Sequence, residues 1–145
     1  MLFNKNFLIG KELVNRKYIT QDQLDEGLIL HQRKNIRLGK ALIELGYLTE
    51  DDLVQVIADQ LSIPYINFAQ EQIASDALAL VPKEIAKSNN VMPIRVTDGT
   101  LLLCVSDPLV SNLQKTFEAL LEMPILFAIA STDALRAAVQ KHYSF

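Results

Sequence analysis

The chain has 145 residues, of which 50% are hydrophobic and 21% charged, the balance of a globular rather than a disordered protein. Its net charge of -3 gives no general electrostatic reason to bind nucleic acid or an anionic membrane. No apolar run approaches the roughly 20 residues that cross a bilayer, and MLFNKNFLIG lacks the features of a signal peptide. We therefore expect a cytoplasmic protein without direct membrane insertion, built as one domain or two small subdomains.

Sequence signatures of catalysis and metal binding are absent. There is no Walker loop, no GxGxxG and no cysteine pair at metal-ligand spacing, and His31 and His142 are far apart. Cys104 stands alone in the apolar run LLLCV, which favours a buried, inert thiol. Asp51 and Asp52 fall in the first turn of an expected helix, where carboxylates complement its dipole. We expect a binding module rather than an enzyme, with no catalytic residue, no metal site and no required cofactor.

Four helices are expected in the first sixty residues, because apolar residues recur there at helical period. These residues are Leu8, Leu13 and Val14; Leu24, Leu28 and Ile29; Leu38, Leu42, Ile43 and Leu45; and Leu53, Val56, Ile57 and Leu61. Thr20 and Thr49 begin the second and fourth helices, with Gln23 and Asp52 at the spacing of a capping box. Gly46 is a typical end for the third helix. The stretch SIPYINF should end the fourth helix and begin an extended segment.

The pattern then changes to short strands and helices. VPKEIAKSN, with proline near its start, predicts a short helix. VMPIRV and LLLCV flank an Asp-Gly pair, which predicts a hairpin, and Pro93 favours an edge or bulged first strand. A helix over 109–121, a strand at PILFAIA and a last helix from Ser131 or Thr132 to about His142 follow. The expected fold class is α+β: a four-helix subdomain over 1–63, then a small subdomain over 64–145 with a β-hairpin and a third strand packed by helices.

The helical part contains an internal duplication. Residues 8–31 align with residues 37–60 at an offset of 29, and seven of the 24 positions are identical. The identical pairs are Gly10/Gly39, Lys11/Lys40, Leu13/Leu42, Tyr18/Tyr47, Thr20/Thr49, Asp22/Asp51 and Leu24/Leu53. Two helical hairpins placed side by side would create a pseudo-twofold surface, which suits a partner that is itself twofold.

The second copy resembles the nucleotide-binding repeat of the MshEN domain family, which lies at the N-terminus of type II secretion and type IV pilus assembly ATPases. The family's repeat begins Arg-Leu-Gly, has a second glycine, then a pair of leucines, and ends on glutamine. The residues at those places are Arg37, Leu38, Gly39, Gly46, Leu53, Ile57 and Gln60. LSIPYINF, VPKEIA, VMPIRV and SDP also resemble the family's second subdomain, so the resemblance covers nearly the whole chain.

The resemblance implies a site for cyclic di-GMP, a twofold-symmetric dinucleotide, across the two repeats. The candidate residues are Arg37, Leu38, Gly39, Leu53, Ile57 and Gln60 in the second copy, Ile9, Gly10, Leu24, Leu28 and His31 in the first, and Asp107 downstream. An arginine fork bonds a guanine edge or a phosphate, and a glycine lets a ligand approach backbone N–H groups. Leucines would pack on the bases, glutamine offers a donor and an acceptor, and Asp107 would accept from guanine N–H groups.

The first copy departs from the family's repeat at three positions. Leu8 stands in place of the arginine, Lys17 in place of the second glycine and His31 in place of the glutamine. One lost charge-assisted hydrogen bond costs about 1.5–3 kcal/mol, or roughly tenfold to a hundredfold in affinity. We therefore expect cyclic di-GMP binding to be weak or absent.

Structural roles stay open for the same residues. Arg37 also suits a solvent-exposed helix start, Gly39 a close packing of two helices, and the repeat leucines a hydrophobic core. Gln60 also suits an ordinary polar position, His31 a partly exposed helix residue, and Asp107 a turn or cap.

Two functions therefore compete. The first is a regulatory and docking domain of a secretion or pilus ATPase, with the motor domain absent from this chain. Its partner would be the cytoplasmic part of an inner-membrane platform protein, which would hold the domain at the membrane periphery. The second is a protein–protein adaptor of the same fold that binds no nucleotide.

Overall fold

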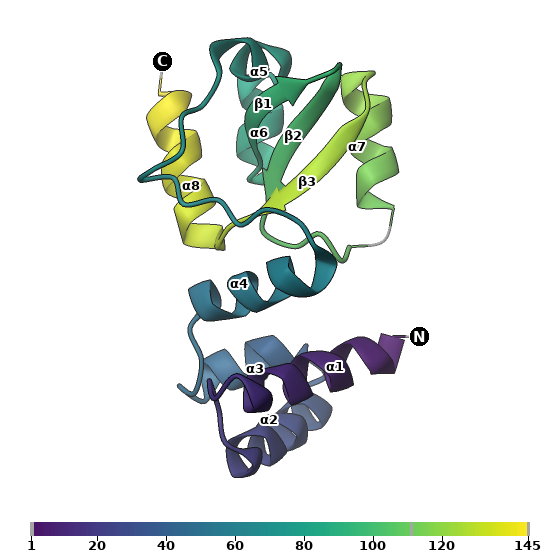
Figure 1. Ribbon diagram of the computed structural model, residues 1–145, viewed down its shortest axis with the longest axis vertical. Helices are drawn as coiled ribbons and strands as arrows, with labels where there is room; N and C mark the ends of the chain where they lie inside the picture. The colour runs from purple at the N-terminus through teal and green to yellow at the C-terminus, as the bar shows by residue number, and fades with distance from the viewer. Residues whose placement is uncertain (1, 111, 145) are drawn as a thin grey trace. The chain divides into compact units, whose positions relative to one another are not determined.

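The computed structural model describes residues 2–110 and 112–144, with side chains from Ile9 onward within these ranges. The chain divides into two compact units, Met1–Gln60 and Leu61–Phe145. Figure 1 shows helices alone in the first unit and helices around a three-stranded sheet in the second. The α+β class expected from the sequence is confirmed. None of the described helices has the length and hydrophobicity that a bilayer crossing requires.

The helical unit consists of α1 (Leu2–Asn15), α2 (Gln21–Lys34), α3 (Leu38–Glu44) and α4 (Glu50–Leu61). The predicted capping box is present, because Gln23 N–H donates to Thr20 Oγ1 at 3.2 Å and Thr20 N–H donates to Gln23 Oε1 at 2.9 Å. Thr49 Oγ1 likewise accepts from Asp52 N–H at 3.1 Å. The core of the unit consists of Leu13, Ile19, Leu24, Leu38, Leu42, Leu48 and Val56.

The spacing of Leu53, Val56, Ile57 and Leu61 predicts that they line the inner face of α4, but of these four only Val56 is fully buried. The buried side chains of α4 are Val54, Val56 and Ala58. Leu53 and Ile57 are half-buried, and Leu61 is 42% exposed. Apolar residues occur on several sides of this helix, so their spacing alone does not select the buried face.

The sheet of the second unit has the strand order β1-β2-β3. β1 (Met92–Thr97) pairs antiparallel with β2 (Thr100–Val105), which pairs parallel with β3 (Ile125–Ile129). Asp98 and Gly99 have φ angles of 52° and 78°, as the expected tight hairpin requires. β1 is an edge strand whose register shifts between Pro93 and Arg95, as Pro93 indicated.

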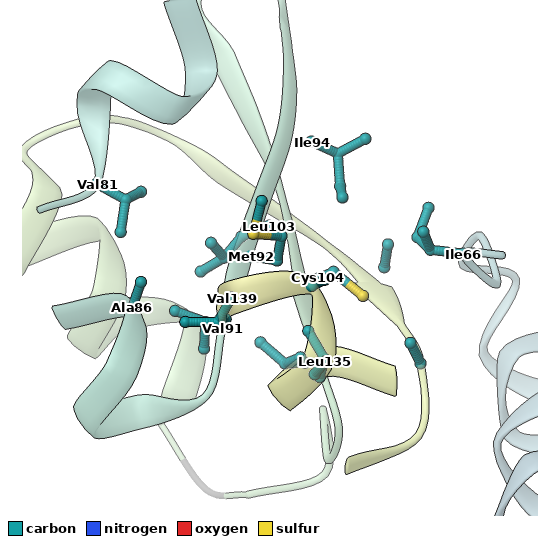
Figure 2. Close-up of a cluster of buried hydrophobic side chains, with 14 of the residues drawn as sticks. Ile66, Val81, Ala86, Val91, Met92, Ile94, Leu103, Cys104, Leu135 and Val139 are labelled. Atoms are coloured by element: carbon teal, nitrogen blue, oxygen red, sulfur yellow. The ribbon is translucent and has the colours of Figure 1, made fainter. Parts of the chain in front are cut away.

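Four helices of the second unit surround the sheet: α5 (Ser75–Leu80), α6 (Lys83–Asn89), α7 (Leu113–Leu121) and α8 (Thr132–His142). Helices α5 and α8 pack along β1, and α7 packs along β3 (Figure 1). Figure 2 shows part of the core, in which Met92, Cys104 and Leu135 lie among other apolar side chains. Tyr143, directly after α8, donates its hydroxyl hydrogen to the Val81 carbonyl at 2.9 Å.

Two helix assignments in this unit differ from the sequence-based ones. Helix α5 was not expected, because the residue before it, Ala74, has no side chain that can cap a helix. Helix α7 begins at Leu113 rather than at residue 109, because Asn112 has a left-handed φ of 60° that a helix interior does not contain. Residue 111 of the expected helix lies outside the described residues. Ser131 caps α8 as expected, accepting from Ala134 N–H at 3.2 Å.

Candidate functional site

Gly10 and Gly39, the glycine pair shared by the two copies, each lie against a leucine of the same copy. A β-carbon built on Gly10 would lie 2.8 Å from Leu24 Cδ1, and one built on Gly39 would lie 2.5 Å from Leu53 Cδ2. Both distances are far below van der Waals contact, so a larger residue at either position forces the leucine to move. Each hairpin therefore packs its two helices together at the same pair of repeat positions. This close packing is a structural reason for the glycine of the Arg-Leu-Gly stretch, and its approach to a ligand remains a prediction.

A cleft of about 380 Å³ lies between α1, α2 and the first residue of α3. Its lining residues are Gly10, Lys11, Val14, Asn15, Gln21, Leu24, Leu28 and Leu38. Leu24 and Leu38 are buried in its floor, whereas Lys11, Asn15 and Gln21 are exposed polar residues of the lining. The cleft therefore combines an apolar floor with polar groups at its solvent-exposed side.

Leu38 connects the two copies of the duplication. A β-carbon on Gly10 would lie 3.2 Å from Leu38 Cδ2, so the first helical residue of the second copy contacts the first copy. Arg37, the residue before it, is exposed and stands at the N-cap position of α3 in an extended conformation with ψ 150°. Arg37 is therefore the sequence neighbour of Leu38, which lines the cleft.

The cleft contains four of the candidate residues, namely Gly10, Leu24, Leu28 and Leu38. Ile9 is half-buried and packs against the core of the same unit. The side chain of Leu8, which replaces the family's arginine, lies outside the described side chains. Three candidates of the first copy, Gly10, Leu24 and Leu28, thus lie together in the cleft.

The candidates of the second copy lie at the start of α3 and along α4. The contact between Gly39 and Leu53 places the first turn of α3 beside the first half of α4. Leu53 and Ile57 are half-buried, and Gln60 is exposed near the end of α4.

His31 holds the segment that joins the two copies. Its ring Nδ1 donates to the Ile36 carbonyl oxygen, and its own carbonyl accepts from the N–H groups of Asn35 and Ile36. Because a carbonyl oxygen only accepts, Nδ1 carries a proton in this contact. His31 therefore fixes the backbone immediately before Arg37.

The backbone of the second glycine position is the same in both copies, although the residue differs. Gly46 has a φ of 80°, and Lys17, its counterpart, has a φ of 64°. A left-handed conformation costs a residue with a β-carbon about 1–2 kcal/mol, a cost that glycine avoids. The first copy thus keeps the turn of the repeat with an unfavourable residue.

Asp107 belongs to the second unit, after β2. Its Oδ1 accepts from Leu109 N–H at 3.1 Å, which is the turn geometry that aspartate commonly stabilises.

The described residues contain neither a group of metal ligands nor a reactive thiol. No three His, Cys, Asp or Glu side chains within 2–110 and 112–144 are grouped so that they could hold a metal ion. Cys104 is fully buried, and burial, with a smaller effect of the Glu71 charge, raises the pKa of its thiol. A protonated, inaccessible thiol is a poor nucleophile, in agreement with the expectation of an inert cysteine.

Sequence reasoning missed three polar residues of the cleft: Lys11, Asn15 and Gln21. One signal was available for the first of them, because Lys11 and Lys40 are identical at corresponding positions of the duplication. Asn15 and Gln21 have no identical counterparts, so the repeat does not reveal them.

Comparison with known proteins identifies relatives of both units. A family model described as the MshEN domain matches residues 61–145. The type IV pilus assembly ATPase PilB of Myxococcus xanthus (strain DK1622) is 27% identical over 136 residues. That similarity covers 94% of this chain and 24% of the relative, so the chain spans about a quarter of that protein's length.

Solved structures with the same fold cover nearly the whole chain. A structure of MshE with cyclic di-GMP is 29% identical and has a TM-score of 0.80, covering 93% of this chain and 98% of that one. The N-terminal domain of XpsE, in one crystal form, is 18% identical with a TM-score of 0.71, covering 92% of each chain. In a second crystal form it is also 18% identical, with a TM-score of 0.56 and 90% of each chain covered. The similarity to XpsE shows the fold alone.

Proposed function

The chain belongs to the MshEN domain family, and on that premise we propose that it is a cyclic di-GMP-binding regulatory and docking domain of a type II secretion or type IV pilus assembly ATPase. The observation that carries this proposal is the similarity to the structure of MshE with cyclic di-GMP over 93% of the chain. The similarity to a pilus assembly ATPase points to the same kind of machine. In this proposal ATP hydrolysis belongs to a motor domain outside these residues.

Arg37 is the main cationic group of the proposed site. It is exposed and adjoins Leu38, which lines the cleft. Its guanidinium offers paired N–H donors to the O6/N7 edge of guanine or to a phosphate, and such two-point contacts are stronger and more specific than single ones. Gln60, exposed near the end of α4, adds a donor and an acceptor in the second copy.

The leucines of the two copies supply apolar surface for the bases. Leu24, Leu28 and Leu38 lie in the cleft, and Leu53 and Ile57 are half-buried on α4. Transfer of an apolar base face from water to such a surface is favourable. This contribution to binding does not require the arginine and glutamine that the first copy lacks. The apolar part of the site is therefore present in both copies, whereas the family's arginine is present in one.

The affinity is expected to be lower than that of a site with two complete repeats. Leu8 cannot replace a guanidinium. The Nδ1 group of His31 already donates its hydrogen bond to the Ile36 carbonyl oxygen. The loss of one charge-assisted contact weakens binding by about tenfold to a hundredfold. We place the domain in the cytoplasm, docked on the cytoplasmic part of an inner-membrane platform protein.

Isothermal titration of cyclic di-GMP into the wild-type chain and into Arg37→Ala tests this function. Arg33→Ala is the matched control, because Arg33 is an exposed arginine of the same unit that does not line the cleft. Binding should weaken by at least about tenfold in Arg37→Ala and stay unchanged in Arg33→Ala. Equal heats for the wild type and Arg37→Ala would dismiss the site.

The alternative function is an adaptor of the same fold that binds protein and no nucleotide. The observation that favours it is the replacement of three repeat residues by Leu8, Lys17 and His31. A ligand that binds only the folded state raises the melting temperature. Capture of the platform protein's cytoplasmic part, together with an unchanged melting temperature in excess cyclic di-GMP, would favour the adaptor.

A further inference from the structure

Apart from Leu38, which belongs to the second copy, the residues that line the cleft have counterparts 29 positions later in the chain. The glycine, the lysine and three apolar positions keep their character in the pairs Gly10/Gly39, Lys11/Lys40, Val14/Ile43, Leu24/Leu53 and Leu28/Ile57. Two positions change their charge, because Asn15 and Gln21 correspond to Glu44 and Glu50. At these aligned positions the sequence therefore has a lysine and two neutral amides in the first copy, and a lysine and two carboxylates in the second. The first copy offers the more favourable surroundings for an anion.

Lys11 is the positively charged residue of the cleft lining. The neighbouring carboxylate of Glu12 is bound by Arg16, whose guanidinium also holds Asp59 at 2.6 Å. Within the part of the chain whose side chains are described, Lys11 takes part in no ion pair. Its ammonium group is therefore available to a ligand at the exposed side of the cleft.

The remaining polar groups of the lining are neutral. Asn15 lies one helical turn after Lys11 on α1, and Gln21 Nε2 donates to Asp25 Oδ1 at 3.0 Å, with Asp25 itself outside the lining. In the second copy, Glu44 pairs with Lys34 at 3.1 Å. An anionic ligand in the first copy's cleft thus meets one cation and no lining carboxylate.

We propose that Lys11 supplies the cationic contact of the first copy, binding a phosphate of cyclic di-GMP where the family's arginine is replaced by Leu8. The inference rests on the proposed function. It assigns a cationic residue to the first half of the site, where this chain lacks the family's arginine. A lysine ammonium binds phosphate as a point charge, whereas an arginine fork also recognises the guanine edge. The two halves of the ligand are then held differently, by Arg37 on one side and by Lys11 on the other.

The contact is tested by titrating cyclic di-GMP into the wild-type chain, Lys11→Gln, Lys11→Arg and Lys40→Gln. Lys40→Gln is the matched control, because Lys40 is the exposed counterpart of Lys11 in the second copy. Lys11→Gln should weaken binding by about fivefold to tenfold, since the lost contact is charge-assisted but exposed to solvent. Lys11→Arg should keep the wild-type affinity, and Lys40→Gln should change it by less than about twofold.

Salt dependence provides a second readout, since each phosphate contact made by a cation adds to the loss of affinity with rising ionic strength. The loss on going from low to high salt should be smaller for Lys11→Gln than for the wild type. Equal affinities of the wild type and Lys11→Gln, with Arg37→Ala still weaker, would overturn the role of Lys11 and leave the proposed function intact. Equal losses in Lys11→Gln and Lys40→Gln would also overturn it, because they indicate non-specific attraction. No binding by the wild type would overturn the proposed function together with this inference.

Discussion

Substitution of Gly39 by alanine is expected to destabilise the helical unit, although alanine is normally the better helix former. In a helix, glycine to alanine ordinarily gains up to about 1 kcal/mol. Here the added β-carbon would lie 2.5 Å from Leu53 Cδ2 and 3.1 Å from Leu53 Cδ1. Overpacking of this kind costs about 1–3 kcal/mol. The expected net loss is about 1 kcal/mol, because Leu53 is half-buried and part of the clash is relieved by movement of its terminal carbons.

The sign of the effect should depend on Leu53. In a Leu53→Ala background the two close carbon atoms are removed, so Gly39→Ala should then stabilise the unit by up to about 1 kcal/mol. The coupling free energy between the two substitutions is therefore expected to be about 2 kcal/mol. Gly10 and Leu24 form the corresponding pair of the first copy, and the same reversal is expected there.

Urea unfolding followed by far-ultraviolet circular dichroism measures this cycle in the wild type, the two single variants and the double variant. The slope with urea concentration should stay constant, so that differences in the midpoint report stability. An effect of Gly39→Ala that agrees in both backgrounds within about 0.5 kcal/mol would refute the packing role of this glycine.

Three further substitutions or reactions test single features of the structure. Lys17→Gly should stabilise the chain by about 0.5–1 kcal/mol in urea unfolding, because Lys17 has a φ of 64°; a loss of stability would contradict this. Tyr143→Phe should cost about 1–2 kcal/mol in the same assay, since the Val81 carbonyl loses a buried donor, and burial raises the pKa of Tyr143 to about 12, which keeps that donor protonated at neutral pH; an unchanged midpoint would argue against the bond. Cys104 should react with a thiol reagent only as fast as the second unit opens, and rapid labelling of the native chain would contradict its burial.

The sequence predicted the elements whose ends carry side-chain signals. Thr20 and Thr49 cap their helices, and Asp98 with Gly99 forms the hairpin, because short polar residues and glycine determine the backbone locally. Helix α5 lacks such a signal, since Ala74 precedes it. The predicted start of α7 at residue 109 was wrong, because the left-handed backbone of Asn112 prevents the helix from beginning before Leu113.

The candidate site was less accessible to sequence reasoning than the fold. The family resemblance predicted Gly10, Leu24 and Leu28 as site residues, and these three line one cleft, but the sequence did not reveal that Leu38 contacts the first copy. That contact joins residues of different helices and has no local pattern in the chain. The bond between His31 and the Ile36 carbonyl is likewise a consequence of how the linker between the copies folds.

The proposed function requires that the duplicated helical hairpins bind cyclic di-GMP. The most direct measurement is a titration of this ligand into the isotope-labelled chain, followed by amide chemical shifts in nuclear magnetic resonance spectra. The largest shifts should occur at residues 9–11, 24–31, 37–39 and 53–60, which carry the candidate residues of both copies. Amide signals of the helical unit that do not shift in excess cyclic di-GMP would contradict the proposed function.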